Sequence, residues 1–210
     1  MTATTTGPRE EAESRADSAA PVPVPASSAW LVLITATVGL VASVVLTTEK
    51  IRLLADPGYV PSCNLNPVLS CGSVMLTDQA SIWGVPHSLF GVVAFTVAVV
   101  SGLLAVAKVP LPRWYWSGLA LGALVGACFA HWLIFVSLHR IGALCPYCMV
   151  VWTVTIPLLV AVGSIAVAQH RARPVLATLY RWRWTLTALW FITLIVLIFL
   201  RFQHYWLTLI

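Results

Sequence analysis

The sequence is poor in charged side chains. Asp, Glu, Lys and Arg make up 9% of its 210 residues, and hydrophobic residues make up 60%. Soluble globular domains average about 25% charged residues, so this composition excludes an ordinary soluble domain and indicates an integral membrane protein with one helical domain. The formal net charge of +5 does not indicate a nucleic-acid partner, because membrane proteins collect Lys and Arg in their cytoplasmic loops.

The first part of the chain lacks apolar periodicity. Residues 1–29 are rich in Ala, Ser, Thr, Pro and Glu, and their four acidic residues outnumber their two arginines. The charge balance excludes the basic start of a signal peptide. This composition predicts a disordered cytoplasmic tail.

Five long apolar runs follow this tail. A helix needs about 20 apolar residues to cross about 30 Å of hydrocarbon, and in lipid a helix satisfies its own backbone. We therefore predict an all-α membrane protein that crosses the lipid bilayer five times. The predicted helices cover Trp30–Thr48, His87–Ala107, Trp114–Leu138, Tyr147–Ala168 and Trp184–Leu200.

Lys and Arg predict the orientation of these helices. With the N-terminus in the cytoplasm, eight of these residues lie on the inner side and four on the outer side, which is the favoured distribution. The predicted organisation is a four-helix unit at 30–168 with an outer loop at 49–86. A basic cytoplasmic loop at 169–183 then leads to a fifth helix and a short outer C-terminus at 184–210.

This orientation places four of the five cysteines on the outer face. Cys63 and Cys71 lie in the first outer loop, and Cys145 and Cys148 lie at the end of the second. The fifth, Cys128, lies within an apolar run, where a free cysteine usually acts as a small buried hydrophobe.

The segment "CPYC" has the features of a redox centre. Pro146 suits the first position of a helix, where its missing N–H group has no consequence. Cys148 then falls in the first turn, where unpaired N–H groups and the helix dipole stabilise a thiolate. A cysteine with a lowered pKa is both a nucleophile and a good leaving group at neutral pH.

The second pair, Cys63 and Cys71, has seven residues between its members and lies in a segment rich in Pro and Gly. A flexible loop of this kind can carry a dithiol between a soluble partner and a fixed CxxC. Taken alone, the pair is more typical of a structural disulfide that staples the loop, but the neighbouring CxxC, which is a common redox centre, reverses this preference. A zinc site formed by all four cysteines is a third interpretation, but structural zinc sites favour C-x2–4-C spacing, so no metal is expected.

Electrons that reach CPYC need an acceptor. The sequence contains no CxxCH haem motif and no flavin or nicotinamide fingerprint. Because CPYC adjoins the membrane, a lipid-soluble quinone, either menaquinone or ubiquinone, is the simplest acceptor.

Several other residues near the outer face are candidates for quinone contacts or packing. His87 begins the second helix level with CPYC, where its ring either donates to a quinone oxygen or points to water. Trp152 lies one turn after Cys148 and either forms a wall of the quinone pocket or faces lipid. His131, deeper in the third helix, is predicted to be neutral and hydrogen-bonded.

At this point the motifs resemble a known family. Two loop cysteines seven residues apart, then "WGVPHSLFG", then a CxxC that opens the fourth helix, resemble the vitamin K epoxide reductase family over roughly residues 30–168. The resemblance is strongest to bacterial members that oxidise thioredoxin-fold proteins. It implies a four-helix bundle around a quinone site, with a fifth helix as in many bacterial members. Because the chain ends at Ile210, we expect no fused thioredoxin-like domain and a separate DsbA-like partner.

The resemblance also implies roles for individual residues. Cys63 would exchange with the partner, and Cys71 would pass electrons to Cys145 through a transient disulfide between the loops. Cys148 would face the quinone and form an adduct with it. The candidate quinone contacts are Thr77, His87 and Trp152. Family members often have Ser at the position of Thr77. The animal enzymes have Asn at the position of His87 and Tyr at the position of Trp152.

The predicted function is that of a thiol:quinone oxidoreductase of the bacterial inner membrane. It would reoxidise a DsbA-like protein and so support disulfide bond formation. One alternative is a quinone or quinone-epoxide reductase that runs on partner thiols. A second alternative is the helix bundle of disulfide-bond protein B. That family has its CxxC in the first outer loop, whereas here the CxxC lies at the end of the second. A non-enzymatic membrane subunit with structural disulfides is a third.

Overall fold

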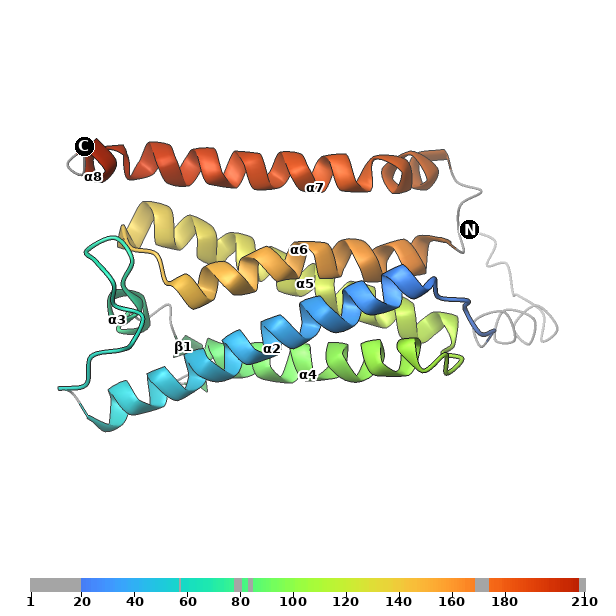
Figure 1. Ribbon diagram of the computed structural model, residues 1–210, viewed down its shortest axis with the longest axis horizontal. Helices are drawn as coiled ribbons and strands as arrows, with labels where there is room; N and C mark the ends of the chain where they lie inside the picture. The colour runs from blue at the N-terminus through green and yellow to red at the C-terminus, as the bar shows by residue number, and fades with distance from the viewer. Residues whose placement is uncertain (1–19, 57, 78–80, 83–84, 169–173, 208–210) are drawn as a thin grey trace, which may run out of the picture.

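The fold is a bundle of long helices. A computed structural model describes residues 20–56, 58–77, 81–82, 85–168 and 174–207. Five helices in these ranges are long and apolar enough to cross a membrane, so the chain is a multi-pass, all-α membrane protein. They lie side by side along the long axis of the molecule (Figure 1). The long helices are α2 (Ala26–Ala55), α4 (His87–Val106), α5 (Arg113–Val136), α6 (Pro146–Val167) and α7 (Pro174–Arg201).

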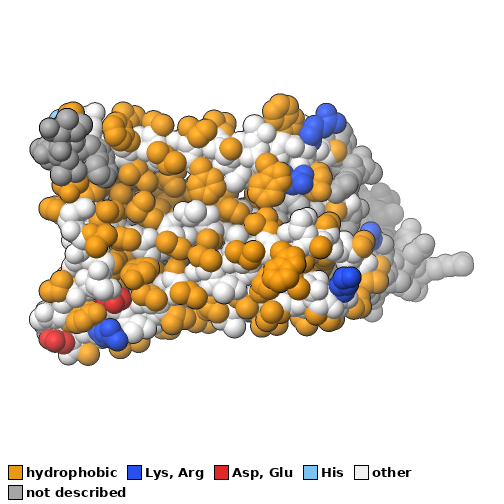
Figure 2. All heavy atoms as spheres, in the orientation of Figure 1, with side chains coloured by type: hydrophobic (Ala, Val, Ile, Leu, Met, Phe, Trp, Pro, Cys, Tyr) orange, Lys and Arg blue, Asp and Glu red, His pale blue; other side chains and the backbone are white. Residues whose placement is uncertain are grey.

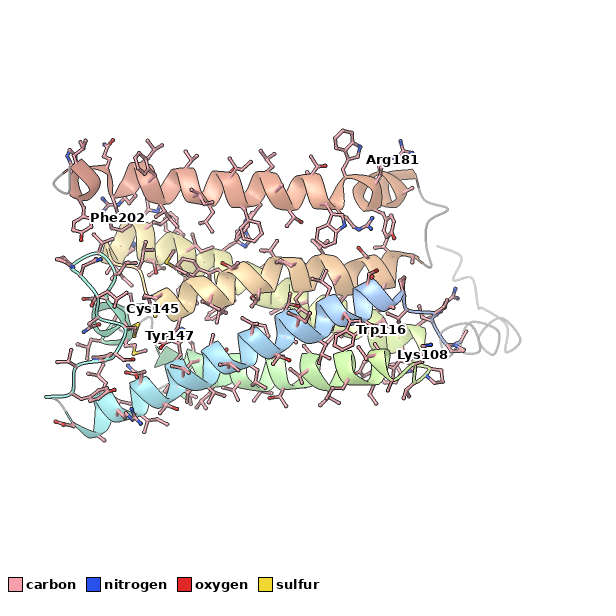
Figure 3. The ribbon with its side chains drawn as sticks, viewed as in Figure 1. Lys108, Trp116, Cys145, Tyr147, Arg181 and Phe202 are labelled. Carbon is pink, nitrogen blue, oxygen red and sulfur yellow. A yellow bond between two sulfur atoms is a disulfide. The ribbon has the colours of Figure 1, made fainter. Side chains whose placement is uncertain are left out.

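The short elements lie together at one end of the bundle (Figure 1). This end also holds Cys145, and we call it the cysteine end (Figure 3). The only strands in the described ranges form one antiparallel pair. The short elements are α3 (Cys71–Met75), β1 (Ser81–Ile82), β2 (Val85–Pro86), the π-helix η2 (Ser137–Ile141) and α8 (Gln203–Leu207).

The surface has the pattern of a membrane-embedded bundle. Figure 2 shows apolar side chains over the middle of one face, whereas the visible charged side chains lie near its two ends. Apolar side chains meet lipid at little cost, whereas charged groups in the hydrocarbon core are expensive. The five helices thus present the surface that their composition predicts.

Helix α2 is longer than its apolar run predicts. It begins at Ala26 and ends at Ala55, whereas the sequence predicts Trp30–Thr48. The additional turns at its end carry Glu49, Lys50 and Arg52. These residue types are good helix formers although they are not apolar, so hydropathy ends the predicted helix too early.

Two predicted irregular segments are partly ordered, which corrects the predicted organisation. In the tail at 1–29, residues 1–19 lie outside the described ranges, but Val22 N donates to Leu111 O over 3.1 Å and α2 begins at Ala26. In the loop at 169–183, residues 169–173 lie outside the described ranges, and α7 already begins at Pro174. Charge and Pro content predicted loops there, but arginines are compatible with a helix and Pro is favoured at a helix start.

The helices do not pack evenly against one another. Helix α2 packs along α4 and α6, and α5 packs along α6. The contact of α2 with α4 is close, because a Cβ atom at Gly102 would come within 2.8 Å of the Leu33 backbone. In contrast, α4 and α5 barely approach each other. The space between them becomes important for the site.

Candidate redox site

Two loops meet at the cysteine end through backbone hydrogen bonds. Leu144 N donates to Val68 O over 2.7 Å, and Ser70 N donates to Leu144 O over 2.9 Å. These bonds form a short parallel bridge between Leu69 and Leu144. Each loop then leads directly into a helix with a cysteine at its start, Cys71 in α3 and Cys145 at the N-cap of α6. The bridge therefore brings the two cysteines together.

Three sulfur atoms lie next to one another at this junction. Cys63 and Cys71 form a disulfide, with their Cα atoms 5.6 Å apart. The Sγ atom of Cys145 lies 3.0 Å from the Sγ atom of Cys71. Because thiol–disulfide exchange begins with a thiolate against a disulfide sulfur, Cys145 occupies the position of an attacking nucleophile.

The surroundings of Cys145 favour its thiolate. A hydrogen bond from the Cys148 side chain lowers the pKa of Cys145, and backbone N–H groups of Cys148 and Tyr147 lower it further, against the opposing effect of burial. From the sequence, the thiolate stabilised by the start of the helix was predicted to be that of Cys148. In the structure the N–H groups at the start of α6 point to Cys145 instead, because this residue is the N-cap.

Both loop cysteines are buried, although their segment was predicted to be a flexible loop. Cys63 is 4% exposed and Cys71 is completely buried. Asn64 contributes to this order, since its Oδ1 atom accepts hydrogen bonds from Gly72 N and Ser70 Oγ. In the sequence, only its position beside Cys63 distinguishes Asn64.

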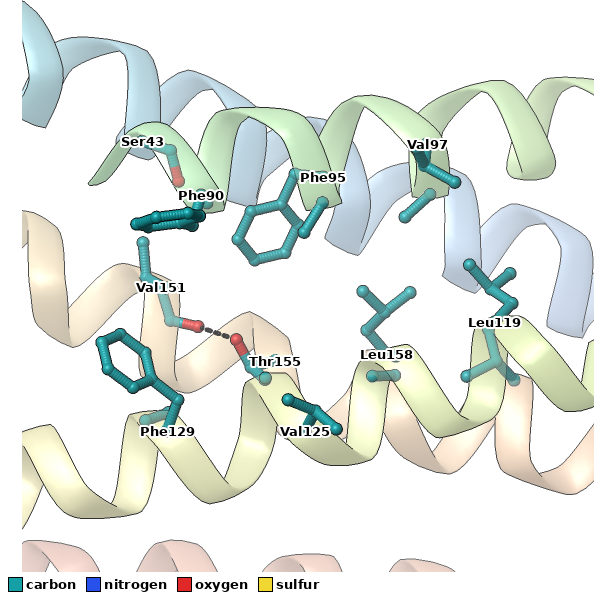
Figure 4. Close-up of a pocket in the computed structure, with 18 of the residues that line it drawn as sticks. Ser43, Phe90, Phe95, Val97, Leu119, Val125, Phe129, Val151, Thr155 and Leu158 are labelled. Atoms are coloured by element: carbon teal, nitrogen blue, oxygen red, sulfur yellow. Dashed lines mark hydrogen bonds between the residues drawn. The ribbon is translucent and has the colours of Figure 1, made fainter. Parts of the chain in front are cut away.

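A large apolar cavity adjoins Cys148. Its volume is about 810 Å³, and residues of α2, α4, α5 and α6 line it. Apolar side chains from α4 and α5 face each other across it (Figure 4). It extends from Cys148, near the start of α6, to Trp114, near the start of α5. Three of its lining residues are Gly118, Gly122 and Gly126, where an added Cβ atom would meet nothing within 4 Å.

Two of the candidate quinone contacts lie on the wall of this cavity. Trp152 is 2% exposed and lines the cavity beside Cys148, so its side chain does not face lipid. His87 also lines the cavity, and its ring packs edge-on against Phe129 with the centroids 6.0 Å apart. The structure therefore brings His87, Cys148 and Trp152 together.

Thr77 lies in a different place. It lines a small adjoining pocket of about 10 Å³ together with His87, Cys148 and Trp152, but it does not line the large cavity. Its Oγ1 atom donates to Val74 O over 2.8 Å. A pocket of this size holds at most about one water molecule. Thr77 is therefore close to Cys148 but separate from the main cavity.

Two residues of α5, His131 and Cys128, were also predicted to lie inside the bundle or to be hydrogen-bonded there. His131 accepts a hydrogen bond from Trp190 Nε1 over 2.7 Å, and its other nitrogen lies 2.7 Å from Ala127 O. A ring that accepts at one nitrogen and donates at the other is neutral, which agrees with the prediction for His131. Cys128 is exposed on α5, so the prediction that it is buried is wrong. An apolar run in a membrane helix does not tell the lipid-facing side from the packed side.

The sulfur cluster has dimensions that also suit a metal ion. The Sγ atoms of Cys63, Cys71 and Cys145 lie within 4.8 Å of one another. Thiolates are the sulfur ligands of zinc. Because two of these three sulfurs are joined in a disulfide, the cluster has the chemistry of a redox centre in this state.

Comparison with known proteins adds one match. The model of the family described as "Vitamin K epoxide reductase family" matches residues 30–163. This range is more than half of the chain and contains all four redox-site cysteines. It ends before α7. No curated protein matches the chain.

Proposed function

Because the chain belongs to the vitamin K epoxide reductase family, and is thus a membrane thiol oxidoreductase, we propose that it is a thiol:quinone oxidoreductase. It takes electrons from a reduced, DsbA-like thioredoxin-fold protein and passes them to a membrane quinone. This reaction reoxidises the partner and supports disulfide bond formation. The observation that carries the proposal is the order of groups at the cysteine end: a loop disulfide, a thiol 3.0 Å from it, and a second thiol on a cavity wall.

The reaction begins at the loop disulfide. A thiolate of the partner attacks Cys63 and releases Cys71. The second partner thiol resolves this mixed disulfide, so the partner leaves as a disulfide and the loop pair becomes a dithiol. Two electrons and two protons have then moved from the partner to Cys63 and Cys71.

The internal step joins the two cysteine pairs. When Cys145 and Cys148 form a disulfide, the Cys71 thiolate attacks Cys145 and releases Cys148. Cys63 then attacks Cys71 and releases Cys145. The products are a Cys63–Cys71 disulfide and two thiols at Cys145 and Cys148, which is the state of the cysteines in the structure. Donation to the Cys145 sulfur from Cys148 and Tyr147 makes Cys145 a good leaving group.

The apolar cavity fits a quinone with an isoprenoid tail. Its volume of about 810 Å³ lies within the usual range of ligand pockets, and its lining is almost entirely apolar. Cys148 and His87 lie at one end, where a polar ring would be held, and the glycines of α5 leave room along the rest. The quinone accepts the two electrons and two protons of the Cys145–Cys148 dithiol, which returns to a disulfide. His87 donates to a quinone oxygen, and Trp152 excludes water from that end.

The proposed location is the bacterial inner membrane, with the cysteine end on the outer face. The excess of Lys and Arg in the predicted inner segments supports this orientation. An outer location also supports the chemistry, because disulfides persist outside the cytosol.

The test is reconstitution of the purified protein in lipid vesicles without oxygen. Reduced DsbA-like protein and either menaquinone or ubiquinone are added, and quinone reduction is followed by absorbance. We expect one partner disulfide for each quinone reduced, and no quinone reduction by Cys145→Ser or Cys148→Ser. Folded wild-type protein that reduces neither quinone would overturn the proposal. Reduction of a quinone epoxide, but not of the quinones, would favour the epoxide reductase.

A further inference from the structure

The last turns of α2 hold the loop in which Cys63 lies. Glu49 is on these turns, and its side chain is only 5% exposed. Its carboxylate accepts three hydrogen bonds: from Ser62 Oγ over 3.0 Å, from Ser62 N over 3.3 Å and from Tyr59 Oη over 3.0 Å. A buried carboxylate requires such partners. All three donors belong to the segment that leads directly into Cys63.

This clamp keeps the sulfur of Cys63 away from any protein partner. Cys63 follows Ser62 directly and is 4% exposed. Tyr59 packs against the same cluster of buried side chains that contains Cys63. A mixed disulfide requires a partner sulfur to approach the attacked sulfur closely. The partner therefore cannot reach Cys63 while Tyr59 and Ser62 remain bound to Glu49.

The other side of the disulfide is held by separate contacts. Lys50 Nζ donates to Met75 O at the end of α3, and Asn64 Oδ1 accepts from Gly72 N over 2.9 Å. The backbone bridge between Leu69 and Leu144 aligns Cys71 with Cys145. None of these contacts involves Glu49. Release of the Glu49 carboxylate thus frees the segment at 59–62 that precedes Cys63, whereas Asn64 on the other side of Cys63 stays bound and Cys71 stays beside Cys145.

We propose that Glu49 is a positioning residue that keeps Cys63 closed to the thioredoxin-fold partner until Tyr59 and Ser62 leave the carboxylate. The proposal rests on the proposed function, in which the partner reacts at Cys63. It adds a gate to the first step of that reaction. The internal exchange between Cys71 and Cys145 proceeds with the gate closed, because their sulfurs are already in contact in the closed structure.

The test measures the two halves of the reaction separately for Glu49→Gln. The amide keeps the size of the carboxylate but presents an N–H group to one of the donors, so it loses at least one charge-assisted hydrogen bond. The first measurement, without quinone, is the rate at which reduced DsbA-like protein reduces the Cys63–Cys71 disulfide, followed by alkylation of the new thiols and mass spectrometry. The second, without partner, is a single turnover of quinone reduction by fully prereduced protein.

We expect Glu49→Gln to raise the first rate by roughly tenfold, on the order of the loss of one such bond. The second rate should stay within about twofold of the wild type. The control is Asp56→Asn, which removes a negative charge from the same region and keeps the Oδ1 atom that accepts from Gly58 N. This control should change neither rate.

The outcomes separate a gate from a general structural role. An unchanged or lower first rate in Glu49→Gln, or an equal fall of both rates, would overturn the gate. If Glu49→Gln does not fold, Ser62→Ala removes the single side-chain donor of Ser62 to Glu49, and it should raise the first rate by about threefold. If wild-type protein reduces no quinone in the second measurement, the proposed function fails. The first measurement then still decides the role of Glu49.

Discussion

The Sγ atom of Cys145 lies 3.0 Å from that of Cys71, although the two residues are 74 positions apart in the chain. Cys71 is at the same time bonded to Cys63. A single attack of the Cys145 thiolate on Cys71 would therefore exchange the Cys63–Cys71 disulfide for a Cys71–Cys145 disulfide.

Cys148→Ser should reveal the disulfide between the loops. In this variant the Cys145 thiolate attacks Cys71 and releases Cys63 as a thiolate, and no cysteine remains to resolve the new bond from the α6 side. No external oxidant is needed, because a thiol and a disulfide are exchanged for another thiol and disulfide. We expect a fraction of the protein to carry a Cys71–Cys145 disulfide, measured by mass spectrometry of alkylated peptides.

The control for this exchange is Cys145→Ser, which removes the attacking sulfur. In that variant the Cys63–Cys71 disulfide should remain intact and Cys63 should not be alkylated. Absence of any Cys71–Cys145 disulfide in folded Cys148→Ser protein would show that the two sulfurs do not exchange.

The pH dependence of Cys145 should depend on Cys148. The Cys148 side chain, followed by the backbone N–H groups of Cys148 and Tyr147, lowers the pKa of Cys145 below the usual 9.0. The thiolate of Cys145 should thus persist to lower pH than that of an ordinary cysteine and be lost as pH falls through the lowered pKa. Cys148→Ala removes the largest cause, so the transition should move to higher pH.

The measurement is a titration of thiolate ultraviolet absorbance in a background with Cys63→Ala and Cys71→Ala, where Cys145 has no loop disulfide to attack. Cys148→Ser serves as the control, because its hydroxyl keeps a hydrogen-bond donor near Cys145 and should produce a smaller change than Cys148→Ala. A transition at the same pH in wild type and Cys148→Ala would contradict the assigned cause.

Filling the cavity should impair only the quinone half of the reaction. Gly122 lines the cavity, and an added Cβ atom there would meet nothing within 4 Å. Gly122→Phe should therefore fold, occupy apolar volume that a quinone tail needs, and raise the KM for quinone by about tenfold or more, equivalent to about 1.4 kcal/mol of lost binding. Reduction of the loop disulfide by the partner should not change.

Gly163 is the matched control for this substitution. An added Cβ atom at Gly163 also meets nothing within 4 Å, but Gly163 is on α6 and does not line the cavity. Gly163→Phe should leave the KM for quinone unchanged. Equal effects of the two substitutions would indicate that the cavity is not where the quinone binds.

Helix α7 should be held to the bundle in part by one hydrogen bond within the membrane. Trp190 Nε1 donates to His131 Nε2 over 2.7 Å. A double-mutant cycle with Trp190→Phe and His131→Phe should show a coupling of about 0.6 kcal/mol, with about 1.7 kcal/mol as the upper limit for such bonds in membrane proteins. The measurement is the free energy of unfolding in detergent. Simple additivity of the two substitutions would show that this bond does not stabilise α7.

The membrane class and the redox chemistry could be predicted from the sequence because both depend on local patterns. An apolar run of about 20 residues predicts a membrane helix wherever it occurs, and all five predicted helices are present. The spacing of Cys145 and Cys148 and the proline between them likewise predict a redox pair at a helix start. The match to the vitamin K epoxide reductase family confirms the resemblance that these motifs carry.

The ends of the helices were predicted less well, for a physical reason. Hydropathy reports where a helix is in lipid, whereas helix propensity decides where the helix ends. Glu49 and Lys50 end the apolar run but continue α2, and their hydrogen bonds to the cysteine loops were therefore missed. In the same way, the arginines after residue 170 predicted a loop, but most of that segment is the start of α7.

By itself, the sequence determined the membrane character, the five helices and the two pairs of closely spaced cysteines, since each of these depends on neighbouring residues. Only the tertiary structure decided how closely Cys71, the exchange partner that the family resemblance implied, approaches Cys145, that Glu49 holds the Cys63 segment, and that a cavity separates α4 from α5. The first of these depends on backbone hydrogen bonds between Leu144 and the loop at 68–70. Almost any side chain permits such bonds, so no local pattern of residues reveals them.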